Sequence, residues 1–97
     1  MKSENKIDGK HWTLLTQHGR VLLLIAKDPE IRVKDLALIA GITERSALAI
    51  ISDLEAAKYV IKKKIGRRNS YKVNSKKPFR HPAESNHKIE ELIKMFI

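Results

Sequence analysis

The sequence of 97 residues contains no cysteine, few aromatic residues and no long apolar run. The lack of cysteine excludes a disulfide framework, a thiolate metal site and a cysteine nucleophile. The longest apolar run, Val21 to Ala26, is far shorter than the ~20 residues that a membrane-spanning helix needs. The first ten residues are polar and do not resemble a signal peptide. We therefore expect one domain that works in the cytoplasm and does not enter a membrane.

Acidic residues are missing from one long segment. Between Lys58 and Arg80 lie ten bases and no acid, and the other ten bases are balanced by all 11 acids of the chain. The net charge of +9 is therefore a property of this segment. Such a localised basic block serves solubility in some proteins, but it is typical of a surface that binds nucleic acid.

Apolar spacing predicts three helices in the first half of the chain. The first begins after Thr16, a good N-cap, and ends before Asp28-Pro29. Trp12, Leu14 and Leu15 suit a separate short helical piece ahead of it. A second helix follows the stub at residues 31–33, with Leu36, Ile39 and Ala40 on its apolar side and Gly41 as its stop. A third opens at Thr43, and its apolar stripe is Ala47, Ile50, Ile51, Leu54 and Ala57.

The second half predicts a hairpin and one more helix. Residues 59–65 are basic and rich in β-branched side chains, residues 66–69 suit a turn, and residues 70–73 return. A proline-interrupted connector leads to a helix over Ala83 to Ile97. We expect a leader over residues 1–10, a domain over residues 11–75, and a connector with its helix over residues 76–97.

The predicted fold class is mainly α with a small β-hairpin (α+β). A short connection that contains glycine, between the second and third helices, is typical of a helix-turn-helix. In that motif the second helix of the pair enters the major groove, and its N-terminal residues meet base edges. The basic hairpin beside it would be a wing.

The segment "RVKDLALIAGITERSALAIISDLEAAKYVIKKKIGRRNSYKV" resembles the winged helix-turn-helix regulators of the MarR and ArsR kind. The similarity covers roughly residues 12–75. It implies a transcriptional regulator whose third helix reads double-stranded DNA and whose wing touches the DNA backbone or minor groove. The expected DNA contacts are Lys34, Thr43, Glu44, Arg45, Ser46, Ala49, Lys62, Lys64, Arg67, Arg68, Asn69, Ser70 and Lys72.

The sequence departs from this family at three positions. Leu48 and Ala49 are apolar where relatives have polar or basic side chains that face the groove, which leaves Arg45 as the one long basic side chain there. Both residues suit contact with thymine methyl groups or with a protein. Lys58 stands where glycine is frequent.

Regulators of this kind are commonly dimers, so we expect a homodimer that spaces two third helices about 34 Å apart. The expected interface residues are Trp12, Ile89, Leu92, Ile93 and Phe96. The alternative is that the apolar face of the last helix closes the core of a monomer.

Other functions have less support in the residues. The four histidines, at positions 11, 18, 81 and 87, form no i, i+4 pair, so no metal is expected, and no cofactor is implied. No acid pair, nucleophile elbow or phosphate-binding glycine loop predicts an enzyme. A protein-docking module and an RNA-binding module remain as alternatives, and the scarcity of aromatic side chains to stack bases disfavours RNA.

Overall fold

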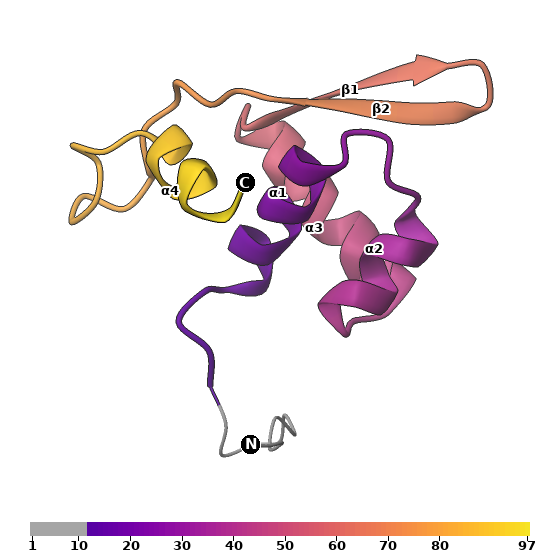
Figure 1. Cartoon of the computed structure of the whole chain (residues 1–97), viewed down its shortest axis with the longest axis horizontal. Helices are drawn as coiled ribbons and strands as arrows, with labels where there is room; N and C mark the ends of the chain where they lie inside the picture. Colours follow the sequence, from indigo (N-terminus) through magenta and orange to yellow (C-terminus); the bar gives the residue numbers. More distant parts are fainter. Residues whose placement is uncertain (1–11) are drawn as a thin grey trace.

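The structure, a computed structural model, describes residues 12–97, and the leader predicted over residues 1–10, with His11, lies outside the described residues. Helices and strands follow in the order α1 (Gln17–Lys27), α2 (Val33–Ala40), α3 (Glu44–Ala56), β1 (Val60–Ile65), β2 (Arg68–Val73) and α4 (Ile89–Phe96). The two strands form one antiparallel hairpin, which confirms the predicted α+β class. Figure 1 shows the hairpin extending over the α1–α2 connection, with α4 at the other end of the molecule. Among residues 12–97, no helix has the length and apolar character needed to span a bilayer.

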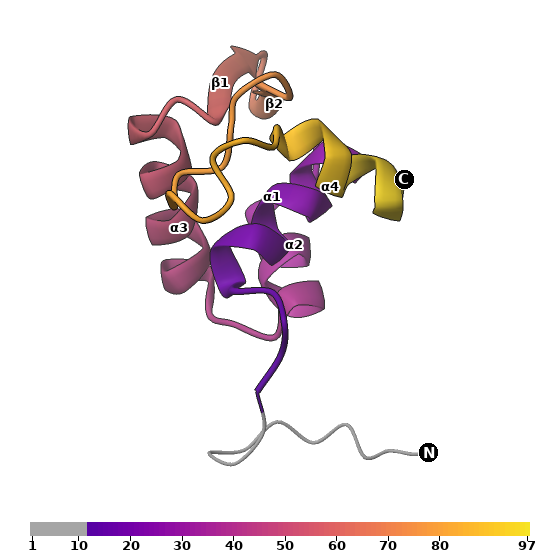
Figure 2. The same cartoon turned by 90° about the vertical axis from the view of Figure 1, so that its left-hand side faces the viewer.

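Helix α1 lies in the centre of the core. Its Val21 and Ile25 are completely buried, with α2, α3, the hairpin and α4 all packed around them (Figures 1 and 2). The side chains that surround α1 are apolar or tyrosine: Ile31, Leu36, Ala37, Ala47, Ile50, Ile51, Leu54, Tyr59, Val60, Tyr71 and Ile89. Each large side chain buried in this way contributes about 1.5–3 kcal/mol relative to exposure.

The predicted helix ends in the first half are confirmed. The Thr16 hydroxyl accepts the Gly19 N–H at 3.1 Å and caps α1, which ends at Lys27, before the Asp28-Pro29 pair. Gly41 ends α2 in the left-handed region, at φ 74°, and the Ile42 N–H then bonds to the Ala37 carbonyl at 3.0 Å. Glycine adopts this backbone without the cost that a side chain imposes.

The predicted apolar side of α2 is partly wrong. Leu36 and Ala40 are buried as expected, but Ile39 is 61% exposed and Ala37 is buried in its place. Helix α2 packs against both α1 and α3. The small side chain of Ala37 lets the helix approach both neighbours, which turns Ile39 toward solvent.

Two predicted helical stretches are not helical. Leu14 and Leu15 form a bend and Trp12 has no regular secondary structure, and α4 begins at Ile89 rather than at Ala83. The reason for the late start is pairing with the connector. The Ile89 N–H donates to the Lys77 carbonyl at 3.0 Å, and the His87 carbonyl accepts the Phe79 N–H at 3.0 Å. Residues 87–89 therefore run extended and antiparallel to the connector.

The side chain of Glu91 caps the N-terminus of α4. Its carboxylate accepts the Lys88 N–H at 3.2 Å and lies 2.8 Å from the His87 ring. The His87 hydrogen bond, followed by that of the Lys88 backbone, lowers the pKa of Glu91 below its ordinary value. A charged carboxylate is favourable at this end of a helix.

Lys58, two residues beyond the end of α3, generates the first prediction. Lys58 has φ 69°, a left-handed conformation that costs a residue with a Cβ about 1–2 kcal/mol. Because glycine also loses more entropy on folding, we expect Lys58→Gly to raise the free energy of unfolding by only about 0.5–1 kcal/mol. Urea denaturation measures the change. Lys58→Ala removes the same charge but keeps the Cβ, so it should give no gain. Equal gains from both variants would contradict the backbone explanation.

Candidate nucleic-acid interface

The basic side chains of the hairpin stand in solvent. All three lysines of β1, and Arg67, Arg68 and Lys72 after them, are exposed. The turn is shorter than the predicted residues 66–69: it consists of Gly66 and Arg67 alone, and Arg68 and Asn69 already belong to β2. Gly66 has φ 63° at the first turn position, the place where type II′ hairpin turns take glycine.

The strand register keeps these charges apart. Lys62 pairs with Tyr71, Lys63 with Ser70 and Lys64 with Asn69. On β2, Lys72 pairs with Ile61 and Arg68 with Ile65. Every base of the two strands therefore stands opposite a neutral residue, which avoids the destabilising effect of like charges directly across a ladder. Because neighbouring residues alternate between faces, both faces of the hairpin carry bases.

Strand β2 is fixed to the α1–α2 connection along its length, from Tyr71 to Arg68 beside the turn. The Tyr71 N–H donates to the Pro29 carbonyl at 2.8 Å, and the Arg68 guanidinium donates to the Glu30 carbonyl at 3.2 Å. The Tyr71 side chain is buried, and this burial, partly offset by its hydrogen bond with Asn69, raises the pKa of its hydroxyl. Arg68 thus has a structural role as well as a charge.

A hollow of about 370 Å³ lies where the hairpin meets α2. Three of its lining residues are arginines, Arg32, Arg67 and Arg68, and Glu30 is the one acid in the lining. A guanidinium group can hold a phosphate through two hydrogen bonds, so three of them suit an anionic backbone. Arg32 was missed by the sequence reasoning, because only the fold brings it beside residues 35 positions further along the chain.

The start of α3 is the second group of predicted contacts. Glu44, Arg45 and Ser46 are exposed in its first turn, and Ala49 is exposed one turn later. Thr43 is also exposed, but its hydroxyl is engaged: it accepts the Ser46 N–H at 3.0 Å and donates to the Ser46 hydroxyl at 3.0 Å. This confirms Thr43 as the N-cap of α3 and gives both hydroxyls a local role.

Apolar side chains accompany this group. Leu48 is 54% exposed on α3, and Leu38 and Ile39 are exposed on α2. Neither Leu48 nor Ala49 belongs to the core, so both departures from the family pattern lie on the surface. Lys34 is exposed in the first turn of α2.

The structure places the predicted contacts on two diverging elements. Helix α3 and the hairpin start from one corner, at residues 57–59, and separate from there (Figure 1). Arg45 lies at the far end of α3, and Arg67 lies at the far end of the hairpin. The residues expected to contact DNA therefore form two groups, with Lys34 and the arginine hollow associated with α2.

The predicted dimer residues have different environments. Ile89 is only 2% exposed and packs in the core of its own chain, which corrects its assignment to an interface. Ile93 also packs against the core, and Leu92 is half-buried. Trp12 and Phe96 are exposed.

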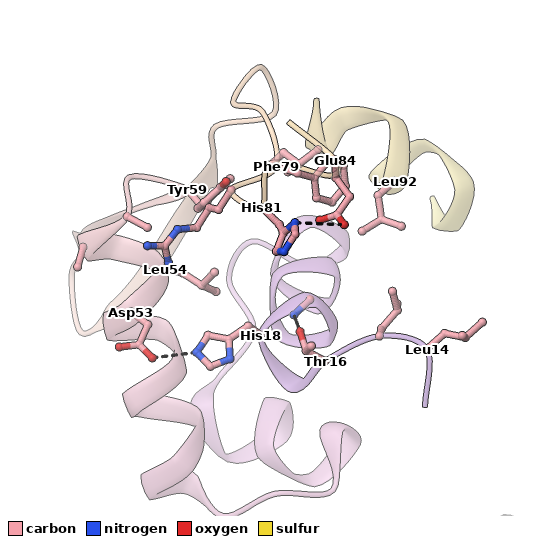
Figure 3. Close-up of a pocket in the computed structure, with 16 residues that line it drawn as sticks. Leu14, Thr16, His18, Asp53, Leu54, Tyr59, Phe79, His81, Glu84 and Leu92 are labelled. Carbon is pink, nitrogen blue, oxygen red and sulfur yellow. Dashed lines mark hydrogen bonds and ion pairs between the residues drawn. The ribbon is translucent and has the colours of Figure 1, made fainter. Parts of the chain in front are cut away.

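The described histidines pair with carboxylates. The His18 ring lies 2.8 Å from the Asp53 carboxylate, joining α1 to α3, and the His81 ring lies 4.0 Å from that of Glu84 (Figure 3). Within residues 12–97, no three histidine, aspartate or glutamate side chains gather into a group that could hold a metal ion.

Comparison with known proteins adds no relative: no protein-family model matches the chain, and no curated protein matches it significantly.

The capping geometry of Thr43 gives the second prediction. Thr43→Ala removes the acceptor for the Ser46 N–H, and we expect it to lower the free energy of unfolding by about 1 kcal/mol. Thr43→Ser keeps the hydroxyl and should remain within a few tenths of a kcal/mol of the parent chain. Urea denaturation distinguishes the two variants. If the serine variant were destabilised as much as the alanine variant, the cap would not be the cause.

Proposed function

We propose that this protein is a winged helix-turn-helix regulator that binds double-stranded DNA as a homodimer and carries out no catalysis. In this proposal α2 and α3 are the helix-turn-helix, α3 is the recognition helix and the hairpin is the wing. The MarR and ArsR regulators, which the sequence resembles, provide the expectation for each role.

The observation that carries the proposal is the exposed, acid-free charge of the hairpin. Its bases stand on both faces of a two-stranded ribbon, and Arg32 adds to them at the hollow beside α2. A rigid ribbon with charge on both faces can contact phosphates on both sides of a DNA groove. Such contacts provide affinity and orientation but carry little sequence information.

Sequence reading in this proposal belongs to α3. Its exposed first turn is short of bases, and Arg45 is the long side chain that can form two hydrogen bonds with a guanine edge. Leu48 and Ala49 are exposed on the same helix and suit contact with thymine methyl groups. Specificity then depends on few contacts, whereas affinity depends on many.

A docking module is the second candidate. It is favoured by the exposed apolar side chains of Leu38, Ile39 and Leu48, which a protein partner would cover. RNA has weaker support, because the tyrosines nearest the hairpin, Tyr59 and Tyr71, are buried and cannot stack on bases.

The third prediction concerns salt. If each subunit neutralises about four phosphates, the logarithm of the association constant should fall with the logarithm of salt concentration with a slope near −3.6 per subunit. Fluorescence anisotropy with a labelled random duplex, between about 50 and 200 mM salt, measures this slope. Absence of duplex binding at low salt, or a flat response, would favour the docking module instead.

The fourth prediction separates the roles of helix and wing. Arg45→Ala should weaken binding to a selected preferred duplex by about 1–3 kcal/mol and leave binding to scrambled DNA almost unchanged. Arg32→Ala combined with Arg67→Ala should weaken binding to every duplex and reduce the salt slope by about one for each phosphate that is no longer neutralised. Arg68 is left intact because it also holds the Glu30 carbonyl.

Both variants are compared in one titration series, on a duplex selected from a random pool and on its scrambled version. Uniform loss of affinity in Arg45→Ala would show that α3 does not read sequence. Loss confined to the selected duplex in the double variant would show that the hollow does not bind phosphate.

A further inference from the structure

An apolar groove of about 1020 Å³ lies between α3, α4 and the connector, with the segment before α1 along its edge. Figure 3 shows Tyr59 at one end of this groove and Leu14 with Leu92 at the other. Small-molecule sites have volumes of about 300–1,000 Å³, so the groove is large enough to hold such a ligand. None of the residues expected to contact DNA belongs to its lining. The groove is therefore a candidate site separate from the nucleic-acid interface.

Much of the lining is apolar. Of its side chains, Leu54 and Ile89 are buried, Phe79 and Leu92 are half-buried, and Leu14 is 90% exposed. The exposed and half-buried members of this set present apolar surface to water inside a concave region. Removal of such surface from water is favourable, so the lining favours a ligand with an apolar body.

The charged residues of the lining leave one cation without a partner. The two acids are engaged by histidines: Asp53 lies 2.8 Å from the His18 ring, and Glu84 lies 4.0 Å from the His81 ring. Arg80 also lines the groove, and it forms no ion pair within residues 12–97. Its guanidinium group is therefore available to a ligand.

The positive charge is concentrated at the Tyr59 end of the groove. Tyr59 is buried, and its hydroxyl donates to the Pro78 carbonyl. Burial raises the pKa of this hydroxyl, and the positive charge of Arg80 lowers it in part. The Lys77 ammonium group lies 5.4 Å from the centre of the Tyr59 ring. Because residues 58–80 contain no acid, this end of the groove is basic while the other end is apolar.

We propose that the groove binds a small amphipathic carboxylate, with its charged group at Arg80 and its apolar body between Phe79 and Leu92. An arginine can hold a carboxylate through two hydrogen bonds, and the apolar lining provides the rest of the contact. An apolar cation would be repelled by Arg80 and Lys77, and a neutral apolar molecule would leave the guanidinium group unused. The inference goes beyond the proposed function, because it requires neither DNA nor a dimer.

The first experiment uses the full chain without DNA and anilinonaphthalene sulfonate (ANS) as the probe. ANS combines an aromatic body with one anionic group, so we expect it to bind the groove with a rise in fluorescence. We expect octanoate to displace it. Octanol, which has the same chain length without the charge, is the matched competitor. Light scattering on the same samples reports whether the chain is monomeric.

Two variants locate the two ends of the ligand. Arg80→Gln should weaken octanoate binding at least about tenfold and change octanol binding by less than about twofold, because only octanoate loses a charge-assisted hydrogen bond. Ala56→Glu adds a negative charge to the lining and should weaken the binding of octanoate and ANS. Ser52→Glu is the matched control, because Ser52 is exposed on the same helix but does not line the groove. Circular dichroism confirms that each variant is folded.

Four results would overturn the inference. Octanoate that does not displace ANS would show that the groove does not take a carboxylate with an apolar chain. Equal effects of Arg80→Gln on octanoate and octanol would show that Arg80 does not hold the charged group. Equal effects of Ala56→Glu and Ser52→Glu would place the probe outside the groove. Loss of ANS binding as a dimer forms would show that a second copy covers the groove. None of these results bears on DNA binding, which is measured separately.

Discussion

Burial of the hairpin root against α1 is the contact on which the rest of the arrangement depends. Val60 and Tyr71 enter the core, while the residues beyond them stand in solvent. A two-stranded hairpin is marginal in isolation, and this one also carries six bases and no acid to pair with them. The core therefore stabilises an element that could not persist alone. The bases of the hairpin remain exposed to solvent, although Arg68 beside the turn is also bonded to the Glu30 carbonyl.

The same anchoring organises the candidate interface. Because the Tyr71 N–H bonds to the Pro29 carbonyl, the hairpin lies beside the start of α2, and the arginine hollow forms between them. Helix α3 ends at the corner from which the hairpin begins, so the two elements keep a defined relation to each other. A change at the hairpin root would therefore disturb the arginine hollow and the orientation of α3 together, even though it removes no charge.

Local chemistry was predictable from the sequence, and long-range pairing was not. Thr16, Gly41 and Thr43 mark helix ends through hydrogen bonds within a few residues, so their roles were read correctly. The start of α4 was predicted wrongly because the Ile89 N–H donates to the Lys77 carbonyl. The two residues are distant in the sequence, so no local pattern indicates this hydrogen bond.

The candidate site divides in the same way. The bases of the hairpin were evident from composition. The recruitment of Arg32, the structural bond of Arg68 and the burial of Ile89 all depend on how distant segments meet. The apolar spacing also predicted that Ile39 is buried, which is wrong. Helix α2 packs against both α1 and α3, and the side that it buries includes the smaller Ala37 instead of Ile39.

The alternation of charged and neutral residues across the hairpin has a consequence for how the strands find each other. A shift of one residue in either direction would bring two bases face to face, Lys62 with Lys72 in one case and Lys64 with Arg68 in the other. The same shift would turn Tyr71 out of the core. Charge repulsion and the loss of Tyr71 burial thus both disfavour the shifted registers. The bases of the hairpin therefore also help to select the one native register during folding.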